Sequence, residues 1–242
     1  MKGAHFPEEV IDLKFFRDWI AKRKKEQDSG TKKKTFFVTI SRDYGCEGWE
    51  LAQKVMELLE KEAPGQWNLF TRQMIEQIVA DEELDQEMVH EISEQKWTFK
   101  DWFVDALVPT YLESHSSHVF RKMKNFILNM ADKGHCVILG AGAQVITHQL
   151  DPEKFYGVHI RITAPHVWKL RRVEQMFKLS REDAERKIED NQDTRDKFMA
   201  DFTGYDSRDS ALYTVTLNNA HCTVDTMATV IVHYLKLQKV LG

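Results

Sequence analysis

Along the chain, short apolar runs typical of strands alternate with apolar residues at helical spacing, which predicts strands followed by helices. The run Phe36–Ile40 is β-branched and aromatic and predicts a buried strand. After a glycine turn, apolar residues from Leu51 to Leu59 recur at helical spacing. Further strands are predicted at 67–70, 136–139, 156–162 and 213–217, and further helices from Arg72 and at 165–177, 181–198 and 223–237. Between 83 and 132 the aromatic and aliphatic positions indicate several helices inserted as one block.

Strands that alternate with helices are typical of an α/β fold whose parallel sheet is covered on both faces. In such folds the ligand lies outside the carboxyl ends of the strands. Three segments are expected there: Ser41–Gly48, Gly140–Ala143 and the turn around Ala164.

A separate amphipathic helix is predicted at residues 7–27, followed by a polar linker. Its apolar stripe is largely aromatic, and basic residues lie around and after it: Ile11, Phe15, Phe16, Trp19 and Ile20 against Arg17, Lys22, Arg23, Lys24 and Lys25. The stripe suits packing on the main domain or on a second subunit, as in a homo-oligomer. Basic amphipathic helices also lie on membranes or bind partner proteins, so these interpretations stay open.

Charge and cysteine content give no indication of a nucleic-acid-binding, disulfide-rich or zinc-binding protein. The chain has 242 residues and a formal net charge of −4, which gives no general nucleic-acid footprint. Its three cysteines form no CxxC pair, so neither a disulfide framework nor a zinc site is indicated. His115 and His118 are three apart but have no third ligand nearby, so no metal site is predicted. No signal peptide or transmembrane segment is recognisable, and we expect a cytoplasmic protein.

The loop after the first strand is the strongest candidate site. Gly45 and Gly48 permit close approach of the backbone to an anion, the next helix adds its dipole, and Arg42 supplies charge. A standard phosphate loop continues with Lys and then Ser or Thr, whereas this chain has Trp49 and Glu50. A tight turn that binds nothing is the alternative.

A basic group on the late helices is the second candidate. It includes Arg171, Arg172 and Arg195, and guanidinium groups bind phosphate oxygens bidentately. Phosphoryl transfer depends largely on such cations. Acidic residues lie among them at three- and four-residue spacings, so ordinary helix-surface ion pairs are the alternative.

Several segments, in their order along the chain, resemble the cytidylate-kinase-like family of P-loop proteins. The resemblance rests on Thr39–Gly45 with Gly48, Cys136–Gly140 with Gly142-Ala143, Ala164-Pro165, Arg171-Arg172-Val173, the helix start at Leu179-Ser180, Arg195, and Leu212-Tyr213 with Asn218. It implies a three-layer P-loop kinase-like fold over 35–242, with residues 1–34 as an extra N-terminal helix and linker. It further implies a helical insertion for the acceptor at 71–132 and an Arg-bearing lid at 178–210.

The same resemblance implies ATP and Mg²⁺ as cofactors and assigns site residues. Donor phosphates would lie on Ser41, Arg42, Gly45, Gly48, Gly140 and Gly142, and the transferring group would lie between Arg171, Arg172 and Arg195. In the first loop this chain has Asp43, Cys46, Glu47 and Trp49 at the positions that vary from the family pattern, so the expected basic residue is missing, and Glu47 and Glu50 are expected to repel donor phosphates. Elsewhere Ala141 stands where the family has an arginine, and Thr71 and Gln192 stand where it has aspartates.

Three functions stay open. The first is a phosphotransferase of the nucleoside monophosphate kinase type, acting on a small nucleotide or related acceptor. The second is a catalytically weakened P-loop domain with a regulatory or interaction role. The third is a structural module without a ligand, which requires side chains such as Trp49 to fill the first loop.

Overall fold

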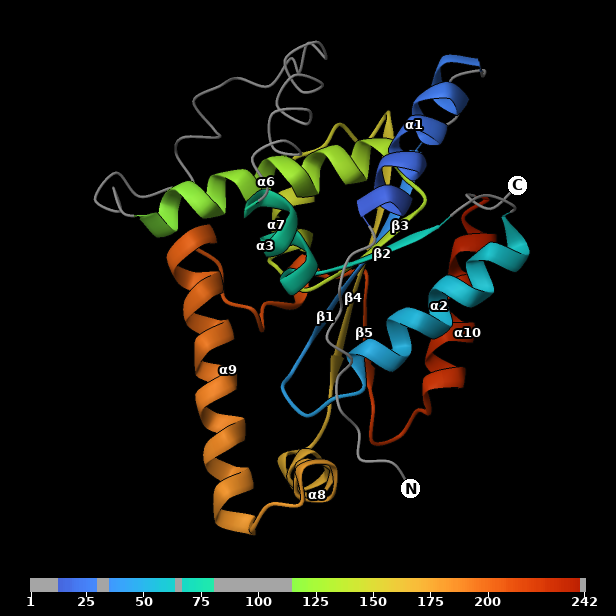
Figure 1. Ribbon diagram of the computed structural model, residues 1–242. Coiled ribbons are helices and arrows are strands. Elements are labelled where there is room, and N and C mark those ends of the chain that lie inside the picture. Colours follow the sequence, from blue (N-terminus) through green and yellow to red (C-terminus); the bar gives the residue numbers. More distant parts are fainter. Residues whose placement is uncertain (1–12, 30–34, 64–66, 81–114, 240–242) are drawn as a thin grey trace.

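The core of the molecule is a five-stranded parallel sheet, as the alternating pattern predicts. The computed structural model describes residues 13–29, 35–63, 67–80 and 115–239 (Figure 1). The strands lie in the order β2-β3-β1-β4-β5 and every pairing is parallel. Their bounds are β1 Thr35–Arg42, β2 Asn68–Thr71, β3 Cys136–Leu139, β4 Phe155–Thr163 and β5 Val215–Asn218.

Helices cover both faces of this sheet. They are α1 Leu13–Ser29, α2 Gly48–Glu62, α3 Arg72–Ala80, α6 His115–Lys133, α7 Ala143–Thr147, α8 His166–Phe177, α9 Arg181–Thr203 and α10 Val224–Leu237, with a short 3₁₀ turn at Ser210–Leu212. The inserted block predicted between β2 and β3 is described only in α3 and α6, and its remainder lies outside the described residues. The three-layer α/β prediction is therefore confirmed (Figure 1).

Helix α9 and strand β5 have bounds that differ from the prediction for a structural reason. Helix α9 runs to Thr203 rather than Phe198, because Met199 continues its buried face and Gly204 ends it in the left-handed conformation at φ 72°. Strand β5 starts at Val215 rather than Tyr213, because the N–H of Tyr213 donates to Ser210 O at 3.2 Å and so closes the preceding 3₁₀ turn.

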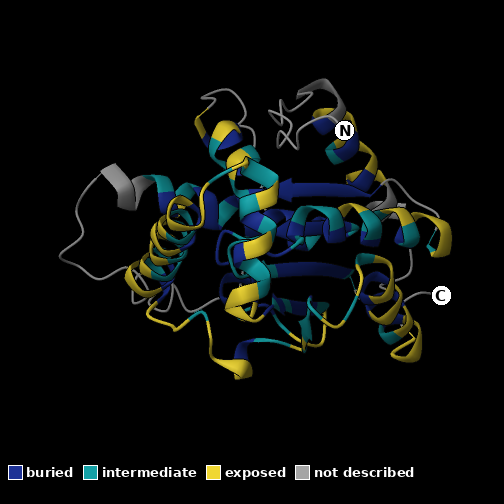
Figure 2. Cartoon of the chain, turned by 90° about the horizontal axis from the view of Figure 1, so that it is seen from below, coloured by how far each residue is buried: buried dark blue, intermediate teal, exposed yellow. Residues whose placement is uncertain are grey.

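Alternate residues of β1 belong to two hydrophobic cores, one on each face of the sheet. Phe36, Val38 and Ile40 pack with α2 and α10, whereas Phe37 packs with α3, α6 and α7. Viewed from below, the strands form the buried centre, and the helices expose their outer sides (Figure 2). Because β1 leads to α2 on one face and β3 leads to α7 on the other, the connections of these neighbouring strands separate at their carboxyl ends. A crevice is expected at such a point.

Helix α1 packs on the same chain. Phe16 and Trp19 are buried, and both rings contact Phe70 of β2 with centroids 5.8 and 5.7 Å apart. The guanidinium of Arg23 donates from Nε and Nη2 to the carbonyl of Lys133, at 2.9 and 2.7 Å. The described end of the predicted aromatic stripe therefore belongs to the core of this chain.

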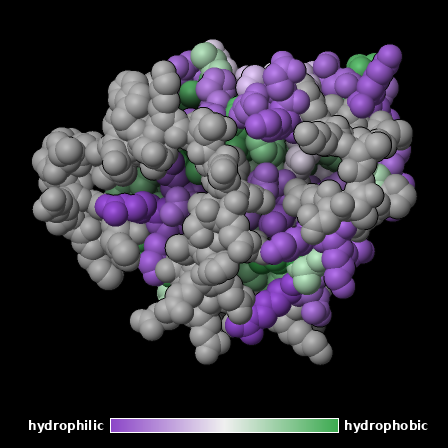
Figure 3. Space-filling model, turned by 90° about the horizontal axis from the view of Figure 1, so that it is seen from above, coloured by the Kyte–Doolittle hydropathy of each residue, from purple (hydrophilic) through white to green (hydrophobic). Residues whose placement is uncertain are grey.

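The visible described surface is mostly hydrophilic from above, and hydrophobic side chains show in small areas (Figure 3). Among the described helices, none has both the length and the apolarity needed to span a bilayer.

Candidate functional site

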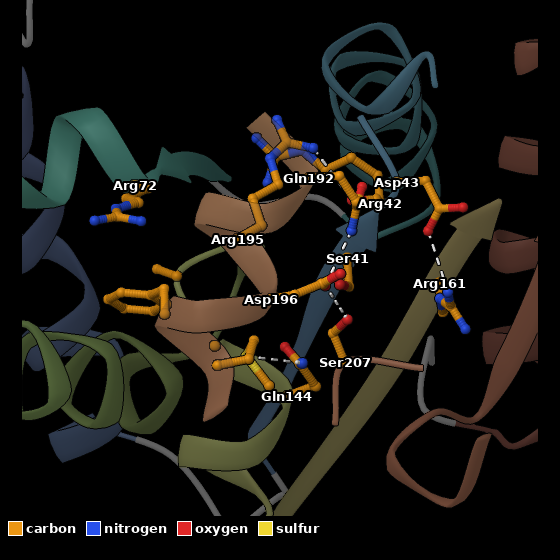
Figure 4. A pocket seen from close by; sticks show the side chains of 15 residues that line it. Ser41, Arg42, Asp43, Arg72, Gln144, Arg161, Gln192, Arg195, Asp196 and Ser207 are labelled. Carbon is orange, nitrogen blue, oxygen red and sulfur yellow. Dashed lines mark hydrogen bonds and ion pairs between the residues drawn. The ribbon is translucent and has the colours of Figure 1, made fainter. Parts of the chain in front are cut away.

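Two cavities lie at the carboxyl edge of the sheet. The smaller, of about 160 Å³, lies where β1 and β3 end, and among its lining residues are Ser41, Arg42, Gly140 and Gly142 (Figure 4). The larger, of about 520 Å³, lies between the loop after β1, the start of α2, α3 and α8. Among the residues lining it are Gly45, Gly48, Trp49, Arg172 and Arg195. The structure thus places the predicted phosphate-binding residues around two adjoining spaces.

Three arginines are shared by the two cavities. Arg42, Arg72 and Arg195 line both of them. The Arg195 Nη1 donates to the carbonyl of Arg42 at 3.2 Å, and its guanidinium lies 5.1 Å from the centre of the Tyr44 ring. The Arg72 guanidinium lies 4.2 Å from the centre of the Phe198 ring. We call these three side chains the arginine wall.

Burial makes the positive charge of Arg195 costly. It lowers the pKa of Arg195, and the positive charge of Arg72 adds to the lowering. Tyr44, Asp43 and Cys46 act in the opposite direction. An anion held between Arg72 and Arg195 relieves their mutual repulsion, so the wall suits a phosphate group.

The glycines at two site positions make room for Arg42. A Cβ at Gly48 would lie 2.9 Å from Cγ of Arg42, and one at Gly140 would lie 2.2 Å from its Nη1. The Arg42 side chain therefore runs from the start of α2 to the loop after β3. There it supplies positive charge beside Ala141, the position where the resemblance expects an arginine.

Five amides of the first loop, those of residues 43, 44, 46, 47 and 48, donate to acceptors within the protein. Asp43 N–H donates to Ile162 O, Cys46 N–H to Asp43 O, and Gly48 N–H to Cys46 O, at 3.1, 3.2 and 2.9 Å. Side-chain oxygens accept from two more: Gln192 Oε1 from Tyr44 N–H and Asn219 Oδ1 from Glu47 N–H, both at 2.8 Å. In this conformation the loop does not present these five N–H groups to an anion.

Arg172 is held by acidic residues of the loop and of α2. Its Nη2 contacts Glu50 at 2.6 Å, its Nε lies 3.7 Å from Glu47, and its Nη1 donates to Gly45 O at 3.2 Å. Glu47 also accepts from Asn219 Nδ2 at 2.9 Å. These carboxylates offset the positive charge of Arg172, the residue that the resemblance expects to contact the transferring phosphoryl group.

Asp43 fixes the loop to β4 and α8. Its Oδ1 accepts from Arg161 at 3.1 Å, and its Oδ2 accepts from Thr163 at 2.7 Å and from Lys169 at 3.2 Å. Burial alone raises the pKa of this carboxyl, but the Thr163 hydroxyl and the two cations outweigh it, so the pKa is lowered. Asp43 is therefore a charged anchor of the site at neutral pH.

The three arginines that were predicted to be catalytic do not lie together. Arg195 lies in the wall and Arg172 lines the larger cavity, whereas Arg171 is exposed and lines neither. Sequence reasoning missed Arg72 and Arg161 as site residues. Arg72 directly follows β2 and therefore lies at the carboxyl edge of the sheet, and this position could have identified it as a site residue. The part played by α9 as a lid stays a prediction.

The carboxylates at the smaller cavity do not suit direct binding of Mg²⁺. Both oxygens of Asp43 accept from protein donors, and Asp196 accepts from Ser207 and Gln192 at 2.6 and 3.0 Å and pairs with Arg208 at 3.3 Å. No cluster of three metal-ligating side chains occurs within the described residues. An Mg²⁺ ion at this edge would depend on phosphate oxygens and water for its ligands. The His115 and His118 side chains lie outside the described residues.

Comparison with known proteins agrees with this architecture. The model of the cytidylate kinase-like family matches residues 37–221. A crystal structure of an uncharacterized protein from Eubacterium ventriosum ATCC 27560 has 16% sequence identity and a TM-score of 0.62, covering 84% of this chain and 99% of that one. This likeness shows a shared fold.

Two further solved structures are matched less well. Dephospho-CoA kinase from Campylobacter jejuni has 14% identity and a TM-score of 0.42, over 84% of this chain and 98% of its own. TT1252 from Thermus thermophilus has 16% identity and a TM-score of 0.39, over 85% and 99%. No curated protein sequence matches the chain.

Proposed function

Because the chain belongs to the cytidylate kinase-like family, we propose that it is a nucleotide-binding phosphotransferase that takes a phosphoryl group from ATP. The acceptor is a small nucleotide or a related phosphorylated compound. The observation that carries this proposal is the arginine wall, because Arg42, Arg72 and Arg195 line both cavities.

In this proposal the acceptor phosphate and the transferring phosphoryl group meet at the positive charge of the wall. An acceptor phosphate needs no general base, so positioning and charge stabilisation supply the catalysis. ATP bound with Mg²⁺ supplies the phosphoryl group. Removing one charged contact to a transition state costs about 10²–10³-fold in rate. Arg195, which is held by the carbonyl of Arg42, is the residue for which we expect such a loss.

A second candidate is a nucleotide-binding protein with weak transfer and a regulatory role. The pairing of Arg172 with Glu50 and Glu47 favours it, as do the internally bonded amides of the first loop. In this function the wall still binds phosphate, but the charge available to a donor at the first loop is too small for efficient turnover.

Ligand-induced stabilisation and turnover together separate these functions. We expect ATP with Mg²⁺, and separately CMP, to stabilise the fold by about 2.7 kcal/mol at a hundredfold excess over the dissociation constant. ADP formation in the presence of both ligands reports transfer. Arg195→Ala should remove most of it. Arg186→Ala is the matched control, because Arg186 lies on the same helix, is exposed and pairs with Asp183.

Three outcomes have distinct meanings. Stabilisation with turnover that depends on Arg195 supports the phosphotransferase. Stabilisation by ATP without turnover favours the regulatory candidate. If neither ligand changes the stability at millimolar concentration, the nucleotide-binding proposal is wrong.

A further inference from the structure

The larger cavity combines cationic and aromatic walls. Arg72, Arg172 and Arg195 line it together with Trp49, Tyr44 and Phe177. Its volume of about 520 Å³ is within the range of small-molecule sites, whereas the smaller cavity at about 160 Å³ suits little more than a phosphate group. A ligand with a flat ring at one end and a phosphate at the other fits these walls.

Two of the three aromatic rings already carry a cation. The Arg195 guanidinium lies 5.1 Å from the centre of the Tyr44 ring, and Lys187 Nζ lies 4.6 Å from that of Phe177. Within the described part of the chain, neither a ring nor a cation stacks on Trp49. Trp49 packs against the main core from the first turn of α2 and also lines the cavity.

Polar groups complete the cavity on its α3 side. Gln73 and Glu76 are lining residues, and they offer hydrogen-bond donors and acceptors that could contact the edge of a base. Arg72, which begins α3, pairs with Glu76 at 2.7 Å and belongs to the wall. Base edge and phosphate would therefore be contacted from neighbouring turns of one helix.

We propose that Trp49 is the stacking surface for the base of a nucleoside monophosphate bound in the larger cavity, with its phosphate on the arginine wall. This inference rests on the proposed function and names the acceptor class of that site. It also gives a role to the residue that replaces the expected cation: Trp49 contributes ring stacking instead of charge.

The test compares a ligand that has a base with one that lacks it. CMP and ribose 5-phosphate are titrated calorimetrically into the wild type and into Trp49→Ala, Trp49→Leu and Trp49→Phe. Base stacking on an aromatic side chain predicts a loss of about tenfold or more in CMP affinity for Ala and Leu, with ribose 5-phosphate changed by less than about twofold and CMP largely retained by Phe. Trp168→Ala is the control, because Trp168 packs on the same core but lines neither cavity.

Each result decides the inference. Unchanged CMP affinity in Trp49→Ala and Trp49→Leu overturns it, and so does an equal loss for both ligands in variants that still unfold cooperatively. If the wild type binds none of CMP, UMP, AMP and GMP at millimolar concentration, it is also overturned. Trp49-dependent binding without ADP formation upholds the inference and rejects the phosphotransferase, so the two proposals fail separately.

Discussion

Replacing Asp43 with asparagine removes one negative charge from the anchor of the first loop. The carboxylate accepts from three donors. The side chains of this network are largely buried, with exposed fractions of 13% for Asp43, 15% for Arg161 and 13% for Lys169. An amide keeps one acceptor oxygen, but its NH₂ group then faces a donor. The variant leaves two largely buried cations without their counter-charge.

The expected loss is about 3 kcal/mol, at the low end of the 3–5 kcal/mol found when one partner of a buried ion pair is removed, because one hydrogen bond is retained. For a chain of this size that corresponds to a fall in melting temperature of roughly 6–12 °C. Urea denaturation followed by circular dichroism at pH 7 measures it. Asp183→Asn, at an exposed ion pair on α9, should change stability far less.

The dependence on pH gives a second check of the same reasoning. The folded-state pKa of Asp43 is lowered, so its stabilisation is fully present above the unfolded-state pKa of about 3.9 and is lost as the pH falls through the lower folded-state value. The difference between wild type and variant should be constant from pH 5 to 7 and should narrow below about pH 4. A loss under about 1 kcal/mol at pH 7, or a difference that widens in acid, refutes the proposed role of this network.

Three further changes test other parts of the structure. Arg72→Ala should weaken phosphate-ligand binding by about tenfold to a hundredfold, measured by calorimetry, because a charge-assisted hydrogen bond is lost; unchanged affinity removes Arg72 from the wall. Gln192→Ala should speed hydrogen exchange of the Tyr44 amide, which loses its 2.8 Å acceptor, and equal exchange contradicts the observed bond. Trp19→Ala should destabilise the fold by about 3–5 kcal/mol in urea, because the ring is fully buried; a neutral effect means that α1 does not pack on this chain in solution.

Local patterns predicted the elements well. The β-branched run from Phe36 gave β1, and the helical repeat from Leu51 gave α2, because burial on a sheet or on one helix face imposes these periods. The helix start at Leu179-Ser180, one of the segments that carry the resemblance, is also found, since the Ser180 hydroxyl caps α9 by accepting from Asp183 N–H at 3.1 Å. Such features depend on residues within a few positions of one another.

The chemistry of the site depends on distant pairs and was only partly predictable. Glu47 and Glu50 were expected to repel donor phosphates, whereas the structure pairs both with Arg172 on α8. Arg72 joins the wall because β2 lies beside β3, an order that periodicity does not encode. The sequence thus indicated which edge of the sheet carries the site, and the tertiary contacts decide which cations remain for a ligand.

The most direct test of the arginine wall is a crystal structure of the protein with a bound nucleoside monophosphate. Our account predicts phosphate oxygens at about 3 Å from guanidinium nitrogens of at least two of Arg42, Arg72 and Arg195. A phosphate bound instead to the amides of residues 44–48, with Gln192 displaced from Tyr44, would contradict it.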